Sequence, residues 1–377
     1  MVVRWPMIPR DVTIEIGEDE VLDGSIDHID IGYAKIIYCQ NLSVNKLPLW
    51  PNVTEVHCGE CYYLTELPLW PNVTLVSCEG CTRLTELQLW PNVTKVLCCN
   101  CTSLTELPLW PNVTFVICDN CLLTSLPEWS NVTDISCNKC PLVELPLWPK
   151  VTCISCTGCQ ELTDLPLWQT VLFVRCSECP KLTSLPLWPV VKGVKCWTCR
   201  SLVLLPLWPS VENVTCYKCS SLTKLPLWEK VMYVDCQECF SLDELPLWTG
   251  VMRVLCSKCY ILTELPAWPN VTRVSCAYCI SLISLPMWPK IEDVFDEGCV
   301  LFRTHIYALL DPTKQIYTSQ LDTCCICMDT PKSVVMDPCY HLYTCKECSE
   351  RVYNESRRCP VCTNYIKYLV NTADDNV

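Results

Sequence analysis

Seven cysteines and one histidine near the C-terminus are spaced as metal ligands. They follow the order Cys-x2-Cys-x11-Cys-x-His-x3-Cys-x2-Cys-x10-Cys-x2-Cys over residues 324–362. Cysteine thiolates and histidine nitrogens are the usual ligands of structural Zn²⁺ sites, which hold the ion with four of them. Eight ligands therefore predict two zinc ions. The predicted ligands are Cys324, Cys327, Cys339, His341, Cys345, Cys348, Cys359 and Cys362.

The segment that must position these ligands is short. A domain of about 40 residues cannot build a sufficient apolar core, so zinc binding would supply its folding energy. Cys325 is a spare thiol, because using it as the first ligand would give Cys-x-Cys, which fits the pattern badly. A disulfide or a single metal site is the alternative interpretation of the same cysteines.

This order of ligands resembles the RING finger of the C3HC4 type. Finer detail resembles the RING of inhibitor-of-apoptosis proteins over residues 321–366, in the segments 327–329, 333–335, 338–342 and 359–362. The resemblance implies that ligand pairs alternate between the two metals. One site would use Cys324, Cys327, Cys345 and Cys348, and the other Cys339, His341, Cys359 and Cys362.

The resemblance also implies the activity of a RING-type ubiquitin-protein ligase. In that family zinc is structural, and the domain docks a ubiquitin-conjugating enzyme so that a substrate lysine attacks its ubiquitin thioester. No covalent intermediate on the ligase is expected. Ile326 and Pro360 match the family's apolar docking positions, although packing over the zinc loops is an alternative role for both. The apolar segment 365–370 could mediate RING dimerisation, as in relatives, or could cap its own domain.

One position departs from the family. Many active members carry Arg or Lys directly after the last ligand, where this chain has Thr363. A threonine cannot provide a charged fork of hydrogen-bond donors. Either ubiquitin transfer is weak, or Lys367 or another group supplies the contact. Thr363 also leaves open an alternative function, a non-catalytic adaptor that sequesters a conjugating enzyme or a host factor.

A tandem repeat precedes this segment. Tryptophan recurs at a regular spacing, as at Trp50, Trp70 and Trp90, and continues to Trp288 with two steps that are one residue shorter. The copies share V-x-x-V-x-C-x-x-C-x-x-L-x-x-L-P, which resembles the leucine-rich repeat over residues 27–302 in about 14 copies. The resemblance predicts a solenoid with a parallel β-sheet on its concave side and short convex turns with little helix. Counting back one full period places Ile36 and Tyr38 on the first strand and Asn41 at the Asn/Cys position of the repeat.

The repeat also predicts a core. In the copy around residue 70, Leu64, Leu67, Val73, Val76 and Cys78 should point inward. The tryptophans should stack in a column, and each indole N–H should find a carbonyl. Asn-Val-Thr recurs where strands begin, and we interpret it as a strand entry rather than a glycosylation acceptor.

Twelve copies carry a Cys-x2-Cys pair. We interpret these cysteines as small buried apolar residues, because each pair occupies the same core positions of the repeat. Occasional metal binding, redox chemistry and disulfides are the alternatives. A thiol-rich metal-binding protein is thus a third hypothesis for the function.

Side chains that point away from the core vary between copies, and repeat arrays commonly bind partners on this concave surface. Aromatic and arginine side chains are the usual anchors of protein interfaces. The candidate partner face for a protein substrate comprises Phe115, Phe173, Arg175, Lys195, Trp197, Tyr217 and Tyr233.

Composition limits the remaining possibilities. The chain has 377 residues, 36 of them cysteine, and a formal net charge of -13, which does not suit nucleic acid. No uninterrupted apolar stretch is long enough to span a membrane, and the N-terminus does not resemble a secretory signal. An intracellular, most simply cytoplasmic, location with reduced thiols is expected. The predicted organisation is an acidic segment 1–26, repeats 27–302, a connector 303–320 with a helical turn at 304–310, a RING 321–366 and a tail 367–377.

Overall fold

The computed structural model describes residues 13–27, 29, 32–282, 285–286, 288–299, 317–318, 322–337, 341–361, 364–366 and 368–371. By its internal contacts the chain divides into two units. The first comprises residues 1–220 with 228–231, and the second comprises residues 221–227 with 232–377.

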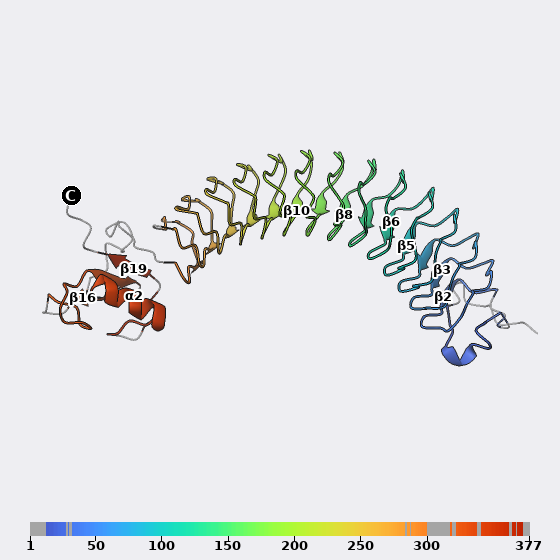
Figure 1. The fold of residues 1–377 in the computed structure, drawn as a ribbon, viewed down its shortest axis with the longest axis horizontal. Helices are drawn as coiled ribbons and strands as arrows, with labels where there is room; N and C mark the ends of the chain where they lie inside the picture. Colours follow the sequence, from blue (N-terminus) through green and yellow to red (C-terminus); the bar gives the residue numbers. More distant parts are fainter. Residues whose placement is uncertain are drawn as a thin grey trace, which may run out of the picture. The chain divides into compact units, whose positions relative to one another are not determined.

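The first unit consists of short coils, each of which adds one three-residue strand to a parallel sheet (Figure 1). Neighbouring strands pair in register, as Val56 with Val76. The first strand lies within the acidic segment, where a 3₁₀ turn, η1 (Glu18–Glu20), follows it. The strands are β1 (Thr13–Glu15), β2 (Ile36–Tyr38), β3 (Glu55–His57), β4 (Leu75–Ser77), β5 (Lys95–Leu97), β6 (Phe115–Ile117), β7 (Asp134–Ser136), β8 (Cys153–Ser155), β9 (Phe173–Arg175), β10 (Gly193–Lys195) and β11 (Asn213–Thr215).

The predicted core is confirmed. All five side chains expected to point inward in the copy around residue 70 are at most 1% exposed. The tryptophans stack, with ring centroids of Trp70 and Trp90 6.1 Å apart. The indole N–H of Trp70 donates to the carbonyl of Pro48 one coil earlier, at 3.0 Å. Trp50, at the first coil of the column, is the exception among the described residues, because its buried indole N–H has no partner. From Trp70 onward the indole hydrogen bonds run from one coil to the preceding one, as Trp90 to Pro68, so the column depends on stacked copies rather than on any single one.

Ile36 and Tyr38 lie on strand β2 as predicted, but the predicted register of this first copy is wrong by one residue. Val56 pairs with Ile37, not with Ile36, because this step is one residue shorter than the usual period. Ile37 is fully buried, whereas Asn41 is exposed in a left-handed turn with φ of 59°. Leu42, 2% exposed, takes the position that we had assigned to Asn41. A shift of one residue exchanges the two faces of a strand, so burial decides the register.

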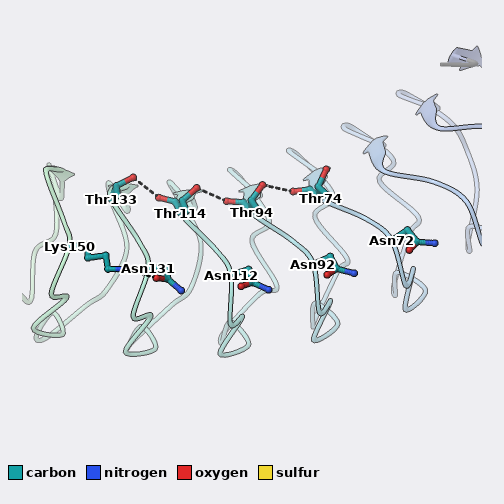
Figure 2. Close-up of a pocket in the computed structure, with 9 residues that line it drawn as sticks. All are labelled: Asn72, Thr74, Asn92, Thr94, Asn112, Thr114, Asn131, Thr133 and Lys150. Carbon is teal, nitrogen blue, oxygen red and sulfur yellow. Dashed lines mark hydrogen bonds between the residues drawn. The ribbon is translucent and has the colours of Figure 1, made fainter. Parts of the chain in front are cut away.

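The Asn-Val-Thr entries form two ladders along the flank of the coils (Figure 2). The hydroxyl of Thr94 donates to the carbonyl of Thr74, and the amide of Asn92 donates to the carbonyl of Pro71. Lys150 continues the asparagine ladder by donating to Asn131 Oδ1. These side chains hydrogen-bond the backbone at the entry to each strand, as the strand-entry interpretation requires.

The second unit begins with further coils of the same kind. Their parallel strands are β12 (Tyr233–Asp235), β13 (Arg253–Leu255), β14 (Arg273–Ser275) and β15 (Asp293–Phe295). A four-stranded sheet of order β16-β18-β17-β19 follows, together with helix α2 (Lys346–Glu355). The four strands are β16 (Tyr317–Thr318), β17 (Val334–Asp337), β18 (His341–Thr344) and β19 (Tyr368–Asn371).

This architecture confirms the predicted fold class, a parallel-sheet solenoid with little helix and a small α+β domain. The helical turn expected at 304–310 lies outside the described residues. None of the helices described is long and apolar enough to cross a bilayer.

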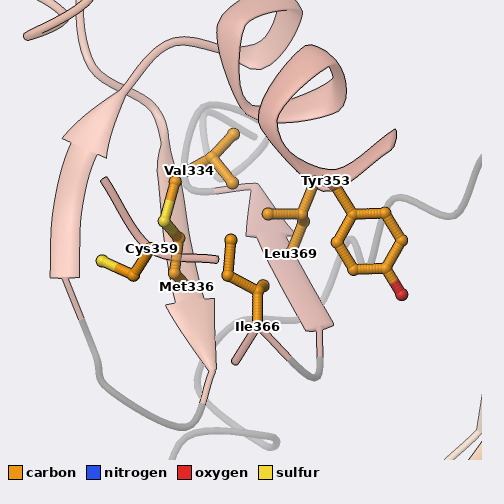
Figure 3. Packing of buried hydrophobic residues seen from close by; sticks show 6 residues of the cluster. All are labelled: Val334, Met336, Tyr353, Cys359, Ile366 and Leu369. Carbon is orange, nitrogen blue, oxygen red and sulfur yellow. The ribbon is translucent and has the colours of Figure 1, made fainter. Parts of the chain in front are cut away.

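The small domain has a core of six buried side chains (Figure 3). Strand β19 pairs antiparallel with β17, which places Val370 beside Val335. The described part of segment 365–370 therefore covers its own domain, one of the two roles considered for that segment. The core comprises Val334, Met336, Tyr353, Cys359, Ile366 and Leu369.

Candidate metal centre and partner surfaces

Four of the predicted ligands come together. Cys324 and Cys327 lie on the loop before β17, Cys345 precedes helix α2, and Cys348 lies in its first turn. Their sulfur atoms all lie within 4.8 Å of one another. Cys327 and Cys345 sulfurs are 3.9 Å apart. Thiolates about 2.3 Å from a tetrahedral zinc ion would be about 3.8 Å apart, so the cluster fits zinc.

The local hydrogen bonds favour the ligand form of Cys327. Its sulfur lies 3.0 Å from the hydroxyl of Thr330. This contact, with the backbone N–H groups of Thr330 and Asp329, lowers the pKa of the Cys327 thiol to about 6. A thiolate is the metal-binding form of cysteine, so this side chain is prepared for coordination at neutral pH.

Half of the second predicted set is described. His341 begins β18, and its Nδ1 lies 3.6 Å from the sulfur of Cys359. The two residues are 18 positions apart in the chain, so the fold brings them together. Cys339 and Cys362 lie outside the described residues.

The repeat cysteines form no comparable cluster. Within the described residues, the group of Cys324 is the only one in which three or more potential ligand atoms lie so close together. Cys61 instead donates its S–H to the carbonyl of Cys39, at 3.1 Å. Burial raises the pKa of Cys61 to about 12, and that of Cys39 well above its usual range. Cys39 and Cys61 are therefore poor nucleophiles and ligands, whereas a hydrogen bond from Cys58 lowers the pKa of Cys81 in the next coil. The structural interpretation of the repeat cysteines thus rests on their burial and on the absence of a ligand cluster among the described residues.

The predicted docking positions differ in burial. Ile326 is partly buried and packs against the cluster of Cys324, Cys345 and Cys348, whereas Pro360 is exposed. Two neighbouring apolar residues escaped the sequence analysis: Met328 is 77% exposed and Val361 44% exposed. The sequence signals these two residues only by their neighbours, since Met328 follows the predicted ligand Cys327 and Val361 follows the predicted docking residue Pro360. Thr363 lies outside the described residues.

A second feature without a sequence signal joins helix α2 to the coil that follows β15. Asp296 is only 3% exposed and accepts a hydrogen bond from the hydroxyl of Tyr353, at 3.1 Å. A guanidinium nitrogen of Arg357 lies 3.6 Å from the same carboxylate oxygen. The guanidinium also lies over the Tyr353 ring, 4.5 Å from its centroid. Burial and the nearby charge of Asp296 raise the pKa of Tyr353, which therefore stays a neutral donor.

A groove of about 590 Å³ follows the ends of strands in the first unit. Of the seven residues proposed for the partner face, Arg175, Lys195 and Trp197 line this groove. The other four do not belong to its lining; Phe115, Phe173 and Tyr217 belong to the same unit, and Tyr233 to the second. Sequence reasoning missed the polar part of the lining, which includes Asp119, Asn138, Ser155 and Thr157.

Comparison with known proteins identifies the C-terminal segment. Residues 320–369 match the family described as zinc finger, C3HC4 type (RING finger). The C-terminal domain is a RING finger. This segment is 46% identical over 50 residues to an inhibitor of apoptosis protein of Gallus gallus, covering 13% of this chain and 8% of that protein. It is 38% identical over 47 residues to a probable E3 ubiquitin-protein ligase of Arabidopsis thaliana, covering 12% of each.

The chain thus spans about a tenth of the length of these curated relatives. Among solved structures it is similar to YopM from Yersinia enterocolitica, with a TM-score of 0.48 and 18% identity, covering 71% of this chain and 64% of that one. A leucine-rich repeat protein from Bacteroides ovatus gives a TM-score of 0.41 and 14% identity, covering 68% and 86%. These two likenesses concern the fold.

Proposed function

We propose that this chain is a RING-type ubiquitin-protein ligase whose repeats bind a protein substrate. The match of residues 320–369 to the RING family, together with the assembled sulfur cluster, carries the proposal. In this proposal the RING docks a conjugating enzyme charged with ubiquitin, and the repeats hold the substrate. Holding the two together raises the local concentration of substrate lysines near the thioester.

The RING residues have positioning roles in this scheme. Cys324, Cys327, Cys345 and Cys348 would hold one zinc ion, and Cys339, His341, Cys359 and Cys362 a second. Zinc would supply structural cross-links and no reactive group. Because Ile326 packs on the first sulfur cluster, zinc binding there would fix its orientation. Ile326 and the exposed Pro360 would then form the apolar contact with the conjugating enzyme.

Ubiquitin transfer in this proposal needs no nucleophile from the ligase. The lysine of the substrate attacks the thioester on the conjugating enzyme directly. The repeat cysteines described in the structure are mostly buried, which agrees with a scheme that does not use them.

A non-catalytic adaptor is the second candidate, which the threonine at position 363 leaves open. Such an adaptor would bind a conjugating enzyme without accelerating discharge of its ubiquitin. The thiol-rich metal-storage hypothesis has less support, because the described repeat cysteines do not gather around any common centre.

A reconstituted ubiquitination assay across a panel of conjugating enzymes tests the proposal. The full chain, loaded with zinc, should form ubiquitin conjugates with at least one enzyme. Binding to a charged enzyme without any discharge would replace the ligase with the adaptor. Metal analysis that found many more than two zinc ions would favour metal storage.

A further inference from the structure

Two cations lie side by side on the outward face of the repeat sheet. Arg175 ends strand β9, Lys195 ends strand β10, and the two residues are direct partners in the parallel ladder. Adjacent strands are about 4.8 Å apart. Like charges directly opposite each other destabilise a sheet, so this pair weakens the fold that carries it. Both side chains are exposed.

Elsewhere in the repeat, carboxylates of adjacent coils neutralise lysine side chains, but the Arg175–Lys195 pair has no such carboxylate among the described residues. On the flanks, Lys181 pairs with Glu161 and Lys192 with Glu212, in each case a carboxylate of an adjacent coil. Within the described part of the chain, neither member of the Arg175–Lys195 pair has a carboxylate within 4.0 Å. The same coils therefore hold compensated cations on the flank and uncompensated ones on the sheet face.

Trp197 adds a donor beside this pair. It lies two residues beyond Lys195, half-buried, with its ring 5.8 Å from that of Tyr217. The core tryptophans donate their indole N–H to a carbonyl of the preceding coil, as Trp208 does to Pro186. No acceptor for the indole N–H of Trp197 occurs among the described residues.

The acid that lines the groove lies at its other end. Asp119 accepts hydrogen bonds from the hydroxyl of Ser136 at 2.7 Å, and from the backbone and amide nitrogens of Asn138 at 2.8 and 3.1 Å. Its coil is three strands away from Arg175, about 14 Å along the sheet. The Arg175 end of the groove is thus basic in a chain whose net charge is -13.

We propose that the Arg175–Lys195 end of the groove binds a phosphorylated side chain in an extended segment of the substrate. A phosphate carries nearly two negative charges and three acceptor oxygens, which match two cations and a free indole donor. The planar arginine fork suits phosphate oxygens, and lysine adds a point charge. A carboxylate would compensate only one of the two cations. This inference rests on the proposed function of the repeats as the substrate-binding part.

Binding of peptide libraries to the full zinc-loaded chain tests the inference. The probes are fluorescein-labelled degenerate peptides with a fixed central phosphoserine, serine or glutamate, measured by anisotropy. The phosphoserine library should bind at least about tenfold more tightly than either other library, the scale of one charge-assisted hydrogen bond. Equal binding of the serine library would overturn the site, and equal binding of the glutamate library would overturn its preference for phosphate.

Variants then locate the site. Arg175→Gln and Lys195→Gln should each weaken phosphoserine binding by about tenfold or more, and Trp197→Phe by less, because only a neutral donor is lost. Lys181→Gln removes the same charge from the flank and should leave binding unchanged. Equal losses in all the variants, or none in Arg175→Gln, would overturn the assignment. Thermal melting of each variant confirms that it is folded.

The peptide assay contains no conjugating enzyme, so it is independent of ligase activity. If the chain promotes ubiquitin discharge but binds the phosphoserine and serine libraries equally, this inference is refuted and the proposed function is not. A chain that binds the phosphoserine library but never discharges ubiquitin would refute the ligase and support the inference.

Discussion

The hydroxyl of Tyr353 donates a hydrogen bond to the buried carboxylate of Asp296, so helix α2 of the RING is tied to the coil after β15. The two residues are 57 positions apart in the chain. A buried carboxylate is costly unless hydrogen bonds and a counter-charge compensate it, and Tyr353 and Arg357 supply both.

Tyr353→Phe should loosen the attachment of helix α2. Removing one donor from a buried carboxylate should lower the free energy of unfolding of this region by about 1–3 kcal/mol. Hydrogen exchange measured by mass spectrometry should become faster in residues 346–355. Tyr365→Phe is the control, because that hydroxyl is exposed and makes no contact with Asp296 within the described residues; it accepts a hydrogen bond from Arg357. Equal protection in wild type and Tyr353→Phe would show that the contact contributes nothing.

Zinc content should be two ions per chain, and Cys324→Ser should lower it to about one. The substitution removes a thiolate from one predicted tetrahedral site and leaves the other intact. Cys325→Ser is the matched control, since this neighbouring thiol is exposed and outside the predicted ligand set. Elemental analysis of the purified full chain provides the measurement. One ion or none in the wild type would contradict the assignment, as would loss of zinc from the control.

Ile326→Ala should weaken binding of a conjugating enzyme without releasing zinc. Truncating an apolar anchor of an interface typically costs more than about 1 kcal/mol, which is at least fivefold in affinity. Titration calorimetry with the conjugating enzyme measures the effect. Ile261→Ala, at an exposed position of the repeats, serves as the control. Unchanged affinity in Ile326→Ala would remove this residue from the docking surface.

Thr363→Arg should raise ubiquitin transfer if the chain is a ligase. An added guanidinium can donate charged hydrogen bonds to the conjugating enzyme and to ubiquitin, on the scale of about 1–3 kcal/mol. That corresponds to a rate increase of up to roughly 100-fold if closure of the complex limits transfer. Discharge of ubiquitin to free lysine is the measurement.

Thr65→Arg, at an exposed position of the repeats, is the control for the added charge. An active wild type with no gain in Thr363→Arg would mean that another residue already makes the contact. Two inactive proteins that still bind the conjugating enzyme would favour the adaptor.

Lys195→Gln should stabilise the unliganded repeats slightly. It removes repulsion between two exposed like charges in direct register, which is on the scale of an exposed ion pair, about 0.2–1 kcal/mol. Lys181→Gln should be neutral or slightly destabilising, because it breaks an exposed ion pair. In urea denaturation, the free energy of unfolding should therefore rise for Lys195→Gln and stay equal or fall for Lys181→Gln. A loss of stability in Lys195→Gln would show that the side chain makes a favourable contact instead of a repulsive one.

Sequence alone determined the features that depend on short spacings. The period of the repeat specified which side chains are buried, because every coil repeats one environment and no coil buries its apolar face alone. The Cys-x2-Cys spacings identified Cys324, Cys327, Cys345 and Cys348 as zinc ligands, and the resemblance to the RING implied that these four share one site, as the fold assembles them. The same reasoning failed at Asn41, where the repeat departs from its period and only the burial of Ile37 and Leu42 sets the register.

Tertiary structure decided the contacts between residues distant in the chain. The pairing of Asp296 with Tyr353 follows no local pattern, because it depends on where helix α2 lies against the last coil. The groove includes Trp197 but excludes Phe173, although both are aromatic residues of the sheet face. Whether a described carboxylate lies within 4.0 Å of Arg175 or Lys195 depends on which neighbouring side chains reach them, and none does. A repeat pattern specifies the environment of each position within one coil, but the neighbours of an exposed side chain are set only when the coils stack.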